Sequence, residues 1–228
     1  MKILLTSSLL IGFAFNSFNL TEKTGKLIDK SQVTYNITDN KVLDGVFTIA
    51  DTAIVTRLRG SYAQNKRVGN WYCFNAQGKV VLRYNYDLNK LVALEKEEFN
   101  AVEIKILDKD AKVAEKASVP IPVCAIDQYK SLMIAELKDE LSHNGKLSAG
   151  NVEAKITALV KADGTAIYTA QYNLAGVSYT TKIYPKDKLF TIQWLPATYE
   201  GKALKSEFTF VSSFMFKPGD HKRFIWNY

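Results

Sequence analysis

The chain has 228 residues, of which 47% are hydrophobic, and its formal net charge is +7. That hydrophobic fraction can build a core, which excludes a disordered chain. Basic and acidic residues alternate and no dense Arg/Lys run occurs, so no nucleic-acid partner is predicted. We interpret the positive charge as solubilising, with association to a membrane surface as the alternative.

The first 18 residues resemble an export signal in composition. Lys2 precedes an apolar run from Ile3 to Phe15, which has the length of a secretory signal peptide and is short for a membrane span. We therefore expect cleavage near Asn16 to Asn19 and a periplasmic or otherwise exported protein. The alternative is that the segment is retained as an N-terminal anchor.

Cys73 and Cys124 are the only cysteines. Export would permit a disulfide, but the two residues fall in different predicted segments, so we favour two buried free thiols and leave the disulfide open. No CxxC motif and no Cys/His ligand spacing occurs, so we predict neither a metal site nor a cofactor.

Residues 33–94 are predicted to form short antiparallel strands joined by turns. Trp71 and Cys73 alternate with Tyr72 and Phe74, which places one side of a ribbon on a core. The sequence "NAQGK" around Gly78 is typical of a hairpin turn.

The stretch "GSYAQNKRVGNWYCFNAQGKVVLRYNY" resembles a MORN-type repeat of the YwqK-like kind. One copy is clear, and residues 35–59 would be a degraded neighbour. The resemblance implies stacked antiparallel hairpins in a scaffold, with turns at the glycines and tryptophan packing on the next hairpin. The matching positions are Gly60, Tyr62, Lys66, Gly69, Trp71, Phe74, Gly78 and Lys79.

The middle of the chain is predicted to separate two regions, 19–117 and 118–228. A strand is expected at Ala101–Leu107, followed by a charged turn and an extended segment, "SVPIPVC". The sequence "AIDQYKSLMIAELKDELSHNGK" then predicts a helix with Asp127 as its N-cap and a stop at Gly145. Its core-facing stripe would consist of Leu132, Met133, Leu137 and Leu141.

Residues 150–174 are predicted to form a β-hairpin with an Asp-Gly turn. Residues 177–194 allow either a strand or the end of a helix. Trp194 and Pro196 then mark a corner, Gly201 a turn, and Leu204–Phe216 alternates like a half-covered strand at a sheet edge.

The order of these elements resembles the C-terminal domain of TonB-type proteins. The phrases "VKADGTA", "QWLPA", "YEGKALKS" and "EFTFVSSFMF" carry the match over residues 125–217. The two resemblances together imply an α+β fold: an antiparallel hairpin-repeat region, followed by a TonB-like domain of helix, β-hairpin, short helix and edge strand. The TonB-type resemblance further implies capture of an envelope partner, such as a segment of an outer-membrane transporter. Trp194 would lock the end of the short helix against the sheet.

The function predicted from these features is non-catalytic protein binding in the cell envelope through an exposed sheet edge. The alternatives are TonB-like energy transduction with a retained anchor, or a structural scaffold that uses the aromatic face of residues 60–87. No enzyme is predicted, because His143 and His221 belong to no catalytic motif. The predicted binding residues are Leu204, Ser206, Phe208, Phe210 and Ser212.

Overall fold

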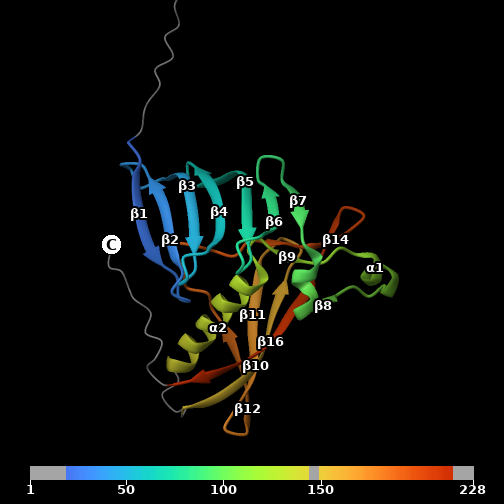
Figure 1. The fold of residues 1–228 in the computed structure, drawn as a ribbon. Coiled ribbons are helices and arrows are strands. Elements are labelled where there is room, and N and C mark those ends of the chain that lie inside the picture. The colour runs from blue at the N-terminus through green and yellow to red at the C-terminus, as the bar shows by residue number, and fades with distance from the viewer. Residues whose placement is uncertain (1–18, 144–148, 218–228) are drawn as a thin grey trace, which may run out of the picture.

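The computed structural model describes residues 19–143 and 149–217. The proposed export signal, the predicted helix stop at Gly145 and His221 lie outside these residues. Within them the chain forms two large antiparallel sheets and one long helix (Figure 1). The broad prediction of an α+β protein made mostly of antiparallel strands is confirmed.

The first sheet is a meander of seven strands in which each strand pairs with the next one along the chain. This confirms the predicted series of strands over residues 33–94. β1 was not predicted, because its sequence "TEKTGK" has no apolar alternation. It is an outer strand, and within the described ranges its one partner is β2. The strands are β1 (Thr21–Lys26), β2 (Gln32–Ile37), β3 (Leu43–Ala50), β4 (Thr56–Ala63), β5 (Lys66–Phe74), β6 (Val80–Asn85) and β7 (Lys90–Leu94).

Trp71 organises the buried face of this sheet. Its side chain is fully buried and lies against Gly60 of the neighbouring strand, where a Cβ atom would come within 2.2 Å of the indole ring. Its Nε1 donates to the carbonyl of Ser61 at 3.2 Å. Gly69 and Gly78 have φ angles of +62° and +74°, a region that favours glycine; Gly78 lies in the predicted hairpin turn, whereas Gly69 lies within β5.

The second sheet has five strands in the order β12-β11-β10-β16-β8. The hairpin β10–β11 is the one predicted, and residues 177–183 prove to be a strand. The C-terminal strand β16 returns to pair with β10, on the side away from β11. The strands are β8 (Glu103–Ile106), β10 (Gly150–Val160), β11 (Ala166–Leu174), β12 (Val177–Ile183) and β16 (Ser206–Phe216).

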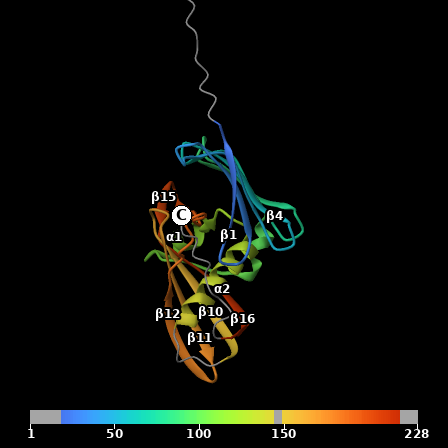
Figure 2. The same ribbon diagram turned by 90° about the vertical axis from the view of Figure 1, so that its left-hand side faces the viewer.

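Helix α2 (Ile126–His143) packs on one face of the second sheet, beside the first sheet (Figure 2). Its predicted stripe of Leu132, Met133, Leu137 and Leu141 is buried. Asp127 is not the N-cap. It lies in the first helical turn, where its carboxylate pairs with the Arg57 guanidinium of β4.

Pairing in the second sheet begins upstream of the predicted boundary at residue 117. β8 follows β7 after a single 3-10 turn, η1, yet it pairs with β16 of the second sheet. Pairing with a strand one hundred residues away has no signal in local sequence. The remaining elements are η1 (Lys96–Ala101), α1 (Ala111–Lys116), β9 (Ile121–Pro122), β13 (Trp194–Leu195), β14 (Ala197–Tyr199) and β15 (Lys202–Leu204).

The short helix expected before Trp194 is absent. Residues 184–193 instead form an extended strap against the first sheet. The Arg67 guanidinium donates to the carbonyl of Thr191 at 2.9 Å, and the Tyr86 hydroxyl donates to Gln193 at 2.8 Å. These contacts hold the strap against the first sheet through the carbonyl of Thr191 and the side chain of Gln193, and Pro185, which lacks an N–H, disfavours a helix there.

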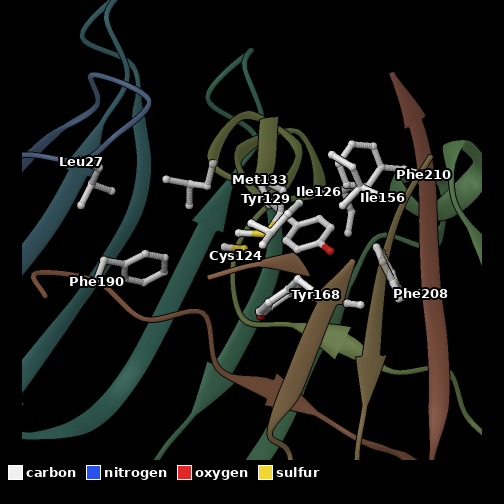
Figure 3. Packing of buried hydrophobic residues seen from close by; sticks show 14 of the residues in the cluster. Leu27, Cys124, Ile126, Tyr129, Met133, Ile156, Tyr168, Phe190, Phe208 and Phe210 are labelled. Atoms are coloured by element: carbon white, nitrogen blue, oxygen red, sulfur yellow. The ribbon is translucent and has the colours of Figure 1, made fainter. Parts of the chain in front are cut away.

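One hydrophobic core joins the two sheets. Figure 3 shows Leu27, from the turn after β1, and Phe190, from the strap, in the same cluster as Tyr129 of α2 and Phe208 of β16. Arg67 reinforces this junction, because its guanidinium carbon lies 4.6 Å from the Trp71 ring centre and 5.4 Å from that of Phe190. The two predicted regions therefore fold against each other rather than as separate units.

Candidate functional site

The strongest candidate site is the part of β16 that is paired on one side only. β10 pairs with β16 along its whole length, from Gly150 opposite Phe216 to Val160 opposite Ser206. β8 covers the other side only from Ser206 to Thr209. Among the residues that the structure describes, no strand pairs with residues 210–216 on that side, which we call the open edge.

One hydrogen bond shows toward which side each residue of β16 directs its backbone N–H and C=O groups. The N–H of Leu107 donates to the carbonyl of Lys205 at 2.8 Å, so Lys205 faces the β8 side. Successive residues of a strand direct their N–H and C=O groups to alternate sides. Val211, Ser213 and Met215 therefore present their backbone donors and acceptors to the open edge.

Side chains on the two faces of the open edge differ in character. Val211 and Met215 point to the outer face, with 60% and 53% of their surface exposed. Phe210 and Phe216 face α2 and are buried, whereas Phe214 on the same face is only half-buried. An extended chain placed along this edge would therefore meet apolar groups on both of its faces.

One side of α2 lies beside the open edge and carries Lys130, Ile134 and Lys138, which we call the edge row. The Nζ of Lys130 lies 5.7 Å from the Phe210 ring centre, and that of Lys138 lies 5.0 Å from the Phe214 ring centre. Ile134 falls between them at helical spacing and is half-buried. Burial lowers the pKa of Lys130, although nearby Asp127 opposes the shift.

The five predicted binding residues lie at different places relative to the open edge. Leu204 lies in β15, and Ser206 and Phe208 lie on the part of β16 covered by β8, with both side chains fully buried. Phe210 and Ser212 reach the open edge, but their backbone groups face β10. Alternation had correctly identified the buried face of the strand, but it carries no information on which flank stays unpaired.

Trp194 has a different role from the one predicted. It follows the strap rather than a helix and pairs in β13 with Pro122 of β9. Its ring centre lies 5.4 Å from that of Tyr129 and 5.1 Å from that of Phe208, so it joins α2 to β16 within the core. Its Nε1 donates to the Tyr168 hydroxyl at 2.8 Å, and burial raises the pKa of Tyr168 to about 12.

Pro196 and Gly201 nevertheless mark the predicted corner. Pro196 separates β13 from β14, and Gly201, with φ of +77°, forms the turn between β14 and β15. The corner is therefore made by two short strand pairs. It delivers the chain from the strap to the start of β16.

Other kinds of site find little support in the described part of the chain. It contains no group of three or more His, Cys, Asp or Glu side chains arranged to hold a metal ion. None of its helices combines the length and the apolar character that a membrane crossing requires. A shallow hollow of about 480 Å³ lies on the outer face of the second sheet, but polar, mostly exposed side chains such as Gln171 and Asn173 line it without forming a catalytic pair.

Cys73 and Cys124 are free and buried, as favoured from the sequence. Burial raises the pKa of both thiols, and their proximity raises that of Cys73 further. Both groups are therefore thiols rather than reactive thiolates at neutral pH.

Comparison with protein-family models, with curated proteins and with solved structures found no match to this chain.

Proposed function

We propose that this protein is a non-catalytic binding module of the cell envelope that captures an extended segment of a partner protein on the open edge of β16. The observation that carries the proposal is the one-sided pairing of residues 210–216. Unpaired N–H and C=O groups in a row are a template for an added strand. The composition of the first 18 residues and the resemblance to TonB C-terminal domains support an envelope location and this mode of binding.

The amino-acid composition of the open edge lacks the features that usually prevent an exposed edge strand from pairing with another chain. Proteins usually protect edge strands with charges, proline or bulges. The sequence "VSSFMF" at 211–216 has no charge and no proline, and its register with β10 is continuous. The edge strands of the two large sheets all carry charged residues. These are Glu22, Lys23 and Lys26 in β1, Lys90 in β7, Glu103 and Lys105 in β8, and Lys182 in β12.

A proline at position 213 tests the proposal. The Ser213 N–H faces the open edge, so Ser213→Pro removes a donor offered to the partner and leaves the donors that pair with β10 in place. We expect crosslinking of the full-length protein to its partner in intact cells to be lost with Ser213→Pro and kept with Ser213→Thr. Mass spectrometry of the crosslinked product identifies the partner and the contacting strand.

Two controls make the result decisive. Thr209→Pro would disturb the pairing with β8, and Ser212→Pro the pairing with β10, so both are expected to destabilise the fold itself. Circular dichroism must show that Ser213→Pro stays folded. Undiminished crosslinking by a folded Ser213→Pro protein would contradict the proposal.

The two alternative functions make different demands. TonB-like energy transduction requires a retained N-terminal anchor, so a mature N-terminus near residue 18 would exclude it. A scaffold role was predicted to use the aromatic face of residues 60–87, but Trp71 and Tyr84 on that face are buried in the core. Such a role would therefore use the outer face of the first sheet, where Val46 is 44% exposed. Val46→Glu should then abolish crosslinking while Ser213→Pro leaves it intact.

A further inference from the structure

The edge row gives the open edge a charge that selects its partner. Lys130 and Lys138 lie over the phenyl rings of β16 on the side of the edge that faces α2. We infer that the captured segment is acidic, with carboxylate side chains on the face that it turns toward α2. This inference rests on the proposed function and specifies its partner.

The carboxylates of helix α2 contact groups on other elements, although Asp127 also lies near Lys130, whose Nζ donates to the carbonyl of Ala101 at 3.1 Å. Asp127 pairs with Arg57 of the first sheet. The remaining carboxylates of the helix contact residue Lys186 at the start of the strap, through its N–H or its Nζ, at 3.0–3.3 Å; they are Glu136, Asp139 and Glu140. The charged side chains that α2 places over the rings of the open edge are therefore both cationic.

The geometry of an added strand predicts the pattern of the segment. A strand paired with Val211, Ser213 and Met215 would lie about 4.8 Å from β16, with alternate side chains on opposite faces. Those on one face would extend toward the edge row, and those on the other toward exposed Val211 and Met215. The segment that fits best alternates acidic with apolar residues.

A second copy of this chain is a less favourable partner for the open edge than an acidic segment. Antiparallel pairing of two β16 strands would place both α2 helices on the same face of the joined sheet. The two edge rows would then face each other across the junction, and the whole chain already carries a net charge of +7. Like charges so placed disfavour the pairing, whereas an acidic segment would bring opposite charges to the edge row.

Synthetic peptides test the inference with the full-length protein. We would compare a fluorescent peptide of about ten residues, with Glu and Val alternating, with its Gln and Lys analogues by anisotropy at low salt. Because two partly exposed ion pairs each contribute modestly, we expect the Glu peptide to bind about fivefold more tightly than the Gln peptide. The Lys peptide should bind most weakly, and added salt should reduce the difference.

Charge reversal of the edge row provides the second arm. The double variant Lys130→Glu with Lys138→Glu should reverse the preference, so that the Lys peptide binds best. Lys182→Glu on β12, at the opposite edge of the same sheet, is the matched control and should change nothing. Reversal by Lys182→Glu instead would overturn the assignment to β16.

The failures of the two proposals are distinguishable. Equal affinities for the Glu and Gln peptides, with binding still abolished by Ser213→Pro, would overturn the acidic partner and leave edge pairing standing. Peptide binding unaffected by Ser213→Pro would count against edge pairing itself. Absence of binding by the Glu peptide, or a dimer in sedimentation that Ser213→Pro dissociates, would overturn the acidic partner in favour of a different segment or a second copy.

Discussion

The two sheets of this protein are assembled from different parts of the chain. In the first sheet, every strand from β1 to β7 pairs with its neighbour in sequence. In the second, β16 joins the hairpin β10–β11 from about fifty residues downstream, and β8 joins β16 from one hundred residues upstream. The strands of the first sheet are thus connected by local turns, whereas the second sheet also contains strands that are far apart in the sequence.

The candidate site exists because of this difference. β16 has eleven residues and β8 has four, so the upstream strand covers only the start of the long strand. A strand joined to its partner by a tight turn tends to match its partner's length, whereas one arriving from a distance need not. The uncovered remainder is the open edge, next to a helix that supplies two lysines.

The largest effect is expected from removing Trp194, which joins α2 to β16 within the core. Trp194→Ala removes contacts with Tyr129 and Phe208 and should lower the free energy of unfolding by about 3–5 kcal/mol. Urea denaturation measures this loss. Tyr184→Ala, at a side chain 58% exposed, is the control and should change stability by less than about 0.5 kcal/mol.

Trp194→Ala also tests whether the sheets are thermodynamically coupled. The shared core predicts that amides of β5 in the first sheet lose hydrogen-exchange protection together with those of β10. Retained protection in β5 alone would mean that the first sheet is stable independently of the second.

Arg57 should give the next largest effect. Its buried guanidinium pairs with Asp51 and Asp127 and donates to the carbonyl of Phe74 at 3.1 Å. Arg57→Met should cost about 2 kcal/mol, less than for a fully buried pair because both carboxylates are partly exposed. A double-mutant cycle with Asp127→Asn isolates the link between the sheets; additive effects would show that this ion pair does not couple them.

A pair of tyrosine variants distinguishes two buried hydroxyl groups of the second region. Tyr168→Phe leaves the Trp194 Nε1–H without its acceptor and should cost about 1–3 kcal/mol. The Tyr129 hydroxyl is buried and has no hydrogen-bond partner among the described residues. Tyr129→Phe should therefore be neutral or stabilising in urea denaturation, and a cost equal to that of Tyr168→Phe would contradict this assignment.

Acid should weaken the first sheet through Asp51. Burial opposes its ionisation, but N–H groups of Val55 and Ala53 and the Arg57 guanidinium outweigh this effect, so the pKa of Asp51 is lowered. Its contribution is fully present above the unfolded-state pKa of about 3.9 and is lost as the pH falls through the lower folded-state value. The stability of Asp51→Asn, measured by urea denaturation across this range, should fall less steeply than that of the unsubstituted protein.

The smallest effect is expected for thiol chemistry in the native state. Cys73 and Cys124 are buried where the sheets meet, and their raised pKa values disfavour thiolates. Both should resist iodoacetamide at about pH 8 until urea unfolds the chain. Labelling at urea concentrations that leave the secondary structure intact would show that the sheets separate before they unfold.

Several elements were predictable because their signals are local. The alternation around Trp71, the Asp-Gly turn of β10–β11 and the stripe of Leu132 to Leu141 all describe contacts within one element or between adjacent ones. β1 and the strap lacked such signals. Polar β1 is held by pairing with β2, and residues 184–193 are extended because Arg67 and Tyr86 bind them.

The order of residues by itself determined which face of each strand is buried, since side chains alternate with a period of two whatever the strand's neighbours are. Only the tertiary structure decided that β8 would cover Ser206–Thr209 and leave Phe210–Phe216 uncovered. The physical reason is that strands pair through backbone groups common to nearly all residues, so side-chain pattern does not specify the partner. The binding role that we propose for the lysines of α2 depends in the same way on the edge beside which the fold places them.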